Sequence, residues 1–170
     1  MSNRIRSADA ATRSPVVIER SYRARVEELW DLWTTKEGFE SWWGPEGFRA
    51  DVYTLDACVG GILHYSMIAD APEQIEAMKR LGRPISHEVR ARFCELTPLR
   101  RLELTNMIDF LPGVEPDEST ILVEFFPSGE SVRMVVTLEP LHDEEFTRMS
   151  IMGFTSQLTK LDRRFGQQTR

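Results

Sequence analysis

The stretch of sequence that decides the fold runs from His142 to Phe165 and reads HDEEFTRMSIMGFTSQLTKLDRRF. Its apolar residues follow the 3, 4, 3, 4 spacing of one helix face, and they are Ile151, Phe154, Leu158, Leu161 and Phe165. Acidic residues open the stretch and basic residues close it, an order that complements the helix dipole. We therefore predict one long C-terminal helix with a continuous apolar face.

The N-terminal half of this helix is apolar over a wider arc than the C-terminal half. Phe146, Met149 and Met152 lie off the main apolar face. We expect this half to be buried on more than one side and to cover a cavity. The half that contains Leu158 and Leu161 should instead anchor the helix to the rest of the domain.

Seven earlier segments have the alternation, or the enrichment in β-branched and aromatic residues, that is typical of strands. They are residues 16–22, 52–55, 63–67, 89–96, 102–108, 121–126 and 132–138. The last two flank Pro127-Ser128-Gly129, which predicts a hairpin. Strands that are grouped together, with helices segregated from them, are typical of the α+β class. We predict a curved antiparallel sheet of about six or seven strands wrapped around the C-terminal helix.

Two short helices are predicted after the first strand. Val26, Leu29, Trp30 and Trp33 fall on one helix face. Gly38 is interpreted as a break, after which Phe39, Trp42 and Trp43 form a second short apolar segment. Gly44-Pro45 ends this segment.

A further short helix is predicted within an insertion over residues 70–82. Asp70 suits the N-cap, Pro72 the first turn, and Gly82 the position after the C-terminus. The pattern leaves three roles open for the insertion: it covers a cavity mouth, it covers a sheet edge, or it forms the contact of a homodimer.

The composition fits one folded domain. The chain has 170 residues, of which 41% are hydrophobic and 28% charged, and its net charge is −6. A negative charge without a basic patch disfavours a nucleic-acid or anionic-membrane surface. No apolar run approaches the roughly 20 residues that span a bilayer. We expect a domain over residues 15–168 after a disordered tail over residues 1–14, with no binding of nucleic acid and no membrane insertion.

The N-terminus and the cysteines indicate the compartment. Residues 1–14 lack the apolar core of a secretory signal. Cys58 and Cys94 do not form a CxxC motif and are too few for a zinc site. We expect a cytoplasmic protein with reduced thiols.

Motifs for catalysis and for metal binding are missing from the sequence. The histidines His64, His87 and His142 have no metal-ligand spacing. Gly60-Gly61 predicts a turn, because no phosphate-binding motif surrounds it. We therefore expect no catalytic residue, no metal and no cofactor, and we keep His87 as a candidate hydrogen-bond partner inside a pocket.

Four local motifs follow one another along about residues 15–165. They are Glu27–Thr35 with Phe39 and Trp42-Trp43-Gly44-Pro45; Asp56 with Gly60-Gly61; Glu95-Leu96-Thr97-Pro98 with Arg101-Leu102 and Leu104-Thr105; and Gly153-Phe154 with Leu158 and Leu161. This order resembles the START-like (SRPBCC, Bet v 1-type) superfamily, and within it the activator of 90-kDa heat-shock protein ATPase homologue-like group. The resemblance implies a helix-grip fold with a cavity between sheet and helix for a small apolar or amphipathic ligand.

Ten residues are candidates for the lining of this cavity. They are Trp42, Trp43, Tyr65, Met67, Phe93, Glu95, Met107, Met149, Met152 and Phe154. Aromatic side chains dominate ligand pockets, and methionines line deformable ones. For each aromatic or methionine residue, plain core packing is the alternative interpretation.

Glu95 has two interpretations. It shares strand parity with Phe93, so an inward direction would place its carboxylate in the cavity, with a raised pKa, as a ligand anchor or general acid/base. The alternative is an ion pair with Arg101 or another arginine.

Three functions follow from these patterns. We favour a ligand-binding module over an enzyme. The resemblance also implies a chaperone as a partner. The third hypothesis, a cyclase or hydrolase acting inside the cavity, depends on an acid or base such as Glu95.

Overall fold

The computed structural model describes residues 14–108, 117–140 and 144–166. The predicted disordered tail therefore lies outside the described residues, apart from Ser14. The same holds for His142, with which the predicted C-terminal helix begins.

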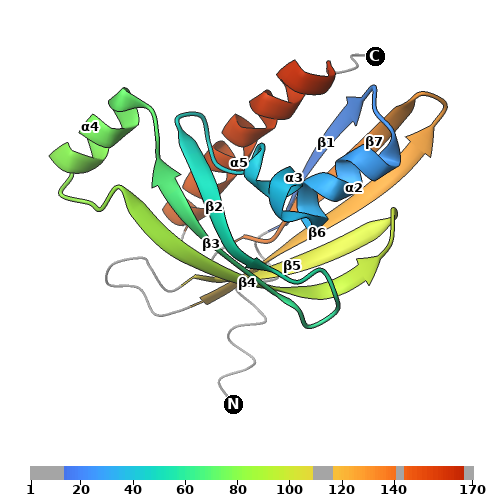
Figure 1. The fold of residues 1–170 in the computed structure, drawn as a ribbon, viewed down its shortest axis with the longest axis horizontal. Coiled ribbons are helices and arrows are strands. Elements are labelled where there is room, and N and C mark those ends of the chain that lie inside the picture. The colour runs from blue at the N-terminus through green and yellow to red at the C-terminus, as the bar shows by residue number, and fades with distance from the viewer. Residues whose placement is uncertain (1–13, 109–116, 141–143, 167–170) are drawn as a thin grey trace.

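Seven antiparallel strands form one sheet in the order β1-β7-β6-β5-β4-β3-β2. Their bounds are β1 Val16–Tyr22, β2 Phe48–Leu55, β3 Ile62–Ala69, β4 Ser86–Thr97, β5 Arg101–Ile108, β6 Asp117–Ser128 and β7 Ser131–Leu138. The sheet curves around the long helix α5, Glu144–Phe165 (Figure 1). This confirms the predicted helix-grip fold. The chain starts at one edge of the sheet with β1 and continues at the opposite edge with β2, so these two strands have free edges.

Two short helices, α2 (Val26–Thr34) and α3 (Lys36–Glu40), connect the two edge strands. Thr35 is the N-cap of α3, because its side-chain oxygen accepts a hydrogen bond of 3.0 Å from the backbone N–H of Gly38. Gly38 was predicted to break the helical segment, but it lies inside α3. An added Cβ at this position would lie 2.1 Å from the carbonyl oxygen of Asp31, so glycine is needed for close approach of the two helices.

The insertion contains the predicted helix, α4, Pro72–Arg80. The predicted cap is wrong: Ala71 is the N-cap, and the Asp70 carboxylate lies 3.5 Å from the guanidinium of Arg49. Gly82 follows the helix with a φ of 68°, as predicted for that position. No residue of α4 is buried.

Alternate residues of the strands point toward α5, and we call this side of the sheet the inner face. It carries most of the core: Leu63 and Tyr65 on β3, Val89, Ala91 and Phe93 on β4, Leu102 and Leu104 on β5, Ile121 and Val123 on β6, and Met134 and Val136 on β7. The outer face carries mostly polar and charged side chains. Bulges interrupt this alternation between Val52 and Thr54 and between Phe93 and Glu95.

Gly153 lies in the middle of α5 and differs from the other glycines of the described residues. Each of those either has a positive φ or has backbone atoms within 3 Å of the place where a Cβ would lie. At Gly153 the nearest atom to an added Cβ is Pro45 Cγ at 3.5 Å, an ordinary van der Waals distance. The structure therefore has room for alanine at this position.

We expect Gly153→Ala to raise the free energy of unfolding by roughly 1 kcal/mol, because glycine in a helix costs about that much relative to alanine. Urea unfolding measures the change. Gly38→Ala is the control and should lower stability, since its new side chain would clash with Asp31. A loss of stability in Gly153→Ala would show that α5 needs glycine there for a reason of packing.

Candidate functional site

Helix α5 is tied to edge strand β1 through Asp162. The Tyr22 hydroxyl donates a hydrogen bond of 2.8 Å to the Asp162 carboxylate, and the Arg20 Nε lies 3.7 Å from the same oxygen. The rings of Tyr22 and Phe165 pack 5.9 Å apart. Burial and the neighbouring Asp162 both raise the pKa of Tyr22, so the hydroxyl stays a hydrogen-bond donor.

The opposite edge of the sheet is tied to α5 through the turn that precedes β2. The backbone N–H of Gly44 donates to Gln157 Oε1 at 2.9 Å, and the Lys160 ammonium donates to the carbonyl of Phe48 at 3.0 Å. Burial lowers the pKa of Lys160. The C-terminal half of α5 thus bridges both edges of the sheet.

Glu46 adds a charged contact to this second attachment of α5. Its carboxylate accepts a hydrogen bond of 2.7 Å from the Thr159 hydroxyl and lies 2.6 Å from the guanidinium of Arg163. These two partners lower the pKa of Glu46. Its backbone N–H also donates to the Ser156 hydroxyl at 2.9 Å.

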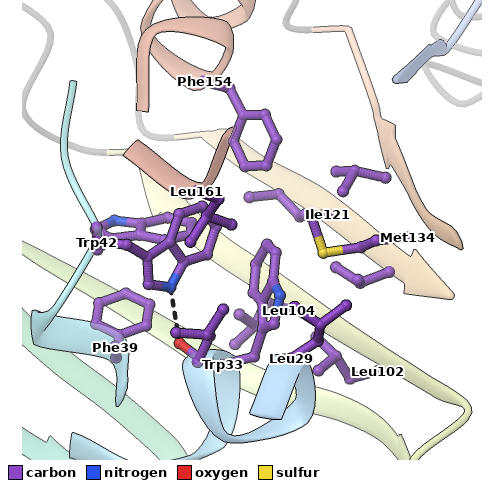
Figure 2. Packing of buried hydrophobic residues seen from close by; sticks show 14 of the residues in the cluster. Leu29, Trp33, Phe39, Trp42, Leu102, Leu104, Ile121, Met134, Phe154 and Leu161 are labelled. Carbon is purple, nitrogen blue, oxygen red and sulfur yellow. Dashed lines mark hydrogen bonds between the residues drawn. The ribbon is translucent and has the colours of Figure 1, made fainter. Parts of the chain in front are cut away.

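An aromatic cluster fills the interior beneath this half of α5 (Figure 2). It consists of Trp33, Phe39, Trp42, Trp43, Tyr65 and Phe154, with ring centroids 4.5–6.3 Å apart. The Trp42 Nε1 donates to the carbonyl of Leu32 and the Trp43 Nε1 to the hydroxyl of Tyr65, each at 2.9 Å. Burial raises the pKa of Tyr65, so its phenol stays protonated. The cluster is closely packed, because its rings contact one another edge to face or stacked, and two of its three indole N–H groups, those of Trp42 and Trp43, have acceptors.

Three buried N–H groups have no acceptor among the described residues: the Arg20 Nε on β1, and two that lie in or close to the aromatic cluster. The latter two are the Trp33 Nε1 and the Gln157 Nε2, and both side chains are fully or almost fully buried. An unsatisfied buried donor costs about 1–3 kcal/mol. A bound water or a ligand oxygen would remove this cost.

The other end of the inner face is less buried. Met67, His87, Asn106 and Ser119 on the strands, and Ile151 on α5, are only partly buried. We call this set the half-buried end. Residues that pair directly across two strands lie on the same face of the sheet. Met67 pairs with His87, and Asn106 pairs with both Ser119 and the buried Ala91, so these strand residues point inward. Burial lowers the pKa of His87, so the imidazole is neutral at pH 7.

Six of the predicted site residues lie in or against the core. Trp42, Trp43, Tyr65, Phe93 and Phe154 are buried, and Met67 packs against them. Their positions agree with an inward direction. Contact with a ligand stays a prediction for all six.

Met149 and Met152 were predicted to cover the interior, but they are 51% and 65% exposed. Each lies two residues before an inner-face position of α5, Ile151 or Phe154, and two residues turn a helix by roughly 200°. They therefore point away from the sheet, whereas Phe146, the third residue of the predicted wider arc, is partly buried. The inner side of the N-terminal half of α5 carries Ile151 and the partly buried Thr147.

Met107 was also predicted to line the cavity, but it lies on the outer face and is 47% exposed. On β5 the buried positions are Leu102 and Leu104, so the opposite parity of Met107 directs it outward. Its cross-strand partner Arg90 is exposed too.

Glu95 does not enter the interior, because a bulge intervenes. The register of β4 shifts between Phe93 and Glu95, so Cys94 is the extra residue and the two no longer share a face. The Glu95 carboxylate lies 3.0 Å from the Arg101 guanidinium, which also lies 3.4 Å from Glu124. The ion pair with Arg101 is thus the correct interpretation.

Four residues of this interior are not predicted as site residues from the sequence: Trp33, Gln157, Asn106 and Ser119. No sequence pattern indicates that Gln157 points inward, because its direction depends on where α5 meets the turn at Gly44. For Asn106 the sequence does indicate the direction. Alternate residues of a strand share a face, so Asn106 lies on the same face as Leu102 and Leu104 and places a polar side chain there.

Two wide clefts on the surface lie away from α5. Both flank the β6–β7 hairpin, one against the start of α2 and one beside Arg100 and Arg101, and α5 lines neither of them. Residues 14–108, 117–140 and 144–166 contain no group of three potential metal ligands. Within these ranges no helix is long and apolar enough to cross a membrane. An enclosed cavity under α5 stays a prediction.

Comparisons with known proteins agree with this architecture. The sequence model of the family described as activator of Hsp90 ATPase homolog 1-like protein matches residues 23–166. A solved structure of a protein from Chromobacterium violaceum is similar with a TM-score of 0.73 at 22% identity, covering 89% of this chain and 96% of that one. The AHSA1 protein from Silicibacter pomeroyi is similar with a TM-score of 0.69 at 21% identity, over 89% and 96% of the two chains. Among curated proteins, none matches. At these identities the solved structures establish the fold alone.

The contact of Glu46 with Thr159 and Arg163 predicts a pH-dependent stability. Because the folded state lowers the pKa of Glu46, its contribution is present above the unfolded pKa and is lost as the pH falls through the folded pKa. We expect Glu46→Gln to cost up to about 1 kcal/mol at pH 7, since the pair is half exposed.

The difference in the free energy of unfolding between Glu46→Gln and the wild type should shrink toward zero below about pH 4. Urea unfolding at several pH values measures it. Glu76→Gln, on the exposed surface of α4, is the matched control and should show no such trend. A difference that is independent of pH would contradict a role for the charge of Glu46.

Proposed function

Because the chain belongs to the family described as activator of Hsp90 ATPase homolog 1-like protein, and shares its helix-grip fold, we propose that it binds a small apolar or amphipathic molecule between α5 and the inner face of the sheet. The observation that carries the proposal is the uneven burial beneath α5. The aromatic cluster closes one end, whereas Met67, Asn106, Ser119 and Ile151 at the other end keep part of their surface accessible.

The contacts that attach α5 to the sheet support the same location for the ligand. The contacts of Asp162, Gln157 and Glu46 fix the C-terminal half of the helix at both sheet edges. A molecule can therefore enter beneath the N-terminal half without breaking these contacts. Covering the exposed apolar surface of Met67 and Ile151 would contribute about 25 cal/mol per Å².

A second candidate function is contact with a 90-kDa chaperone, which the family description suggests. The outer side of α5 offers exposed apolar surface for a partner at Met149 and Met152. The enzymatic hypothesis, in contrast, loses the residue on which it depended, because Glu95 is held in an ion pair on the outer face.

The two candidates predict different results for substitutions on the two sides of α5. If a ligand binds beneath the helix, Ile151→Trp should weaken binding of the uncharged apolar dye N-phenyl-1-naphthylamine at least tenfold, because the indole fills the site. Met149→Trp, two residues earlier on the outer side, should leave the affinity unchanged. Fluorescence titration measures both.

Native mass spectrometry of freshly purified protein provides an independent check through co-purified mass. The ligand-binding proposal fails if the dye shows no saturable binding and no co-purified molecule is found. The chaperone candidate predicts that Met149→Asp and Met152→Asp abolish retention of the chaperone in a pull-down. Equal retention by the wild type and the variants would remove it.

Two further expectations belong with these proposals. The exposed helix α4 provides surface for a homodimer contact, and sedimentation of the purified protein tests this. A cytoplasmic location is likewise an expectation, drawn from the sequence.

A further inference from the structure

A polar pair interrupts the apolar inner face of the sheet. Asn106 on β5 and Ser119 on β6 are directly paired across the two strands. Both point toward α5, because their neighbours Leu104 and Ile121, two positions along each strand, are buried in the core. The pair lies in the half-buried end, beside the buried Ala91.

This pair has an unusual chemistry for its position. An amide and a hydroxyl together offer donors and acceptors but no charge. The described residues supply neither side chain with a hydrogen-bond partner, although both are partly withdrawn from water. Neither side chain is among the fully buried groups that lack a partner, so both keep some contact with water and their hydrogen-bonding capacity is open to a ligand.

The cations Arg20 and Lys160, which border the interior, are held at the C-terminal half of α5. Arg20 lies beside Asp162, and Lys160 donates to the carbonyl of Phe48. His87 is neutral at pH 7. Among the described residues of the half-buried end, none therefore carries a positive charge that would offset the cost of withdrawing an anionic head group from water.

We propose that Asn106 and Ser119 form a subsite that binds an uncharged hydrogen-bonding group, such as a hydroxyl, of an otherwise apolar ligand. The apolar body lies against Met67, Ile151 and the edge of the aromatic cluster at Phe154. This inference rests on the proposed function and specifies the class of ligand: an apolar molecule with a neutral polar end, in preference to a fatty acid or another amphipathic anion.

The test compares two probes that differ only at the polar end, 1-decanol and decanoate, by displacement of N-phenyl-1-naphthylamine at pH 7.5. We expect the wild type to bind 1-decanol at least tenfold more tightly than decanoate. Asn106→Leu removes the hydrogen bonds at nearly constant size, and it should weaken 1-decanol binding about tenfold. Decanoate binding should change little.

Matched controls come from the neighbouring residues on the outer face. Thr105 and Thr120 are paired in the same way on the same two strands, with their hydroxyl oxygens 3.3 Å apart, but they point outward. Thr105→Val and Thr120→Val should leave both affinities unchanged. Ser119→Ala is a milder inner-face variant that keeps the test decisive if Asn106→Leu does not fold, as judged by circular dichroism.

The outcomes separate this inference from the proposed function. If neither probe nor dye binds, the proposed function itself fails. If the probes bind but decanoate equals or exceeds 1-decanol, or if the inner-face and outer-face variants behave alike, the subsite is wrong and the ligand-binding function stands. Preferential loss of 1-decanol binding in the inner-face variants alone supports the subsite.

Discussion

The attachment of α5 to both free edges of the sheet is the constraint on which the rest of the structure depends. The twist of its strands and its two bulges bend the seven-stranded sheet, but they do not join its edge strands β1 and β2 to each other. Asp162 holds the helix to Tyr22 at one edge, and Gln157 and Glu46 hold it to the turn before β2 at the other. Because one rigid helix bridges both edges, the sheet between them is kept curved, and its inner face becomes the interior of the domain.

The same attachment divides that interior into two unequal parts. Beneath the tied half of α5, tryptophans from α2 and from the turn after α3 meet Phe154, and their indole N–H groups at Trp42 and Trp43 find acceptors. This part is packed and fixed. Beneath the other half of the helix, the inner face is less covered and includes polar side chains at Asn106 and Ser119. Fixed packing beside a less covered, uncharged surface is an arrangement that suits binding of a neutral, largely apolar molecule.

Much of this architecture was predictable because it depends on local patterns. The 3, 4 spacing that ends at Phe165 predicts α5, the alternation along β3 and β5 predicts which residues are buried, and Gly82 predicts where α4 ends. The predictions failed for two reasons: a bulge changed the direction of the residues after it, and apolar side chains were expected inside although their position in a regular element directs them outward. The bulge at Cys94 turns Glu95 outward, and the position of Met149 on the helix turns it toward solvent although its chemistry suits a core.

The sequence by itself therefore determined the family, the order of the elements and the inward residues of the regular segments, because periodicity and short motifs act within a few residues along the chain. Only the tertiary structure decided where α5 rests. That position places Gln157 on Gly44, leaves the Trp33 indole N–H without an acceptor among the described residues, and keeps the N-terminal half of the helix over a partly covered, polar stretch of the sheet. These features depend on contacts between segments more than a hundred residues apart, and no local pattern encodes such a distance.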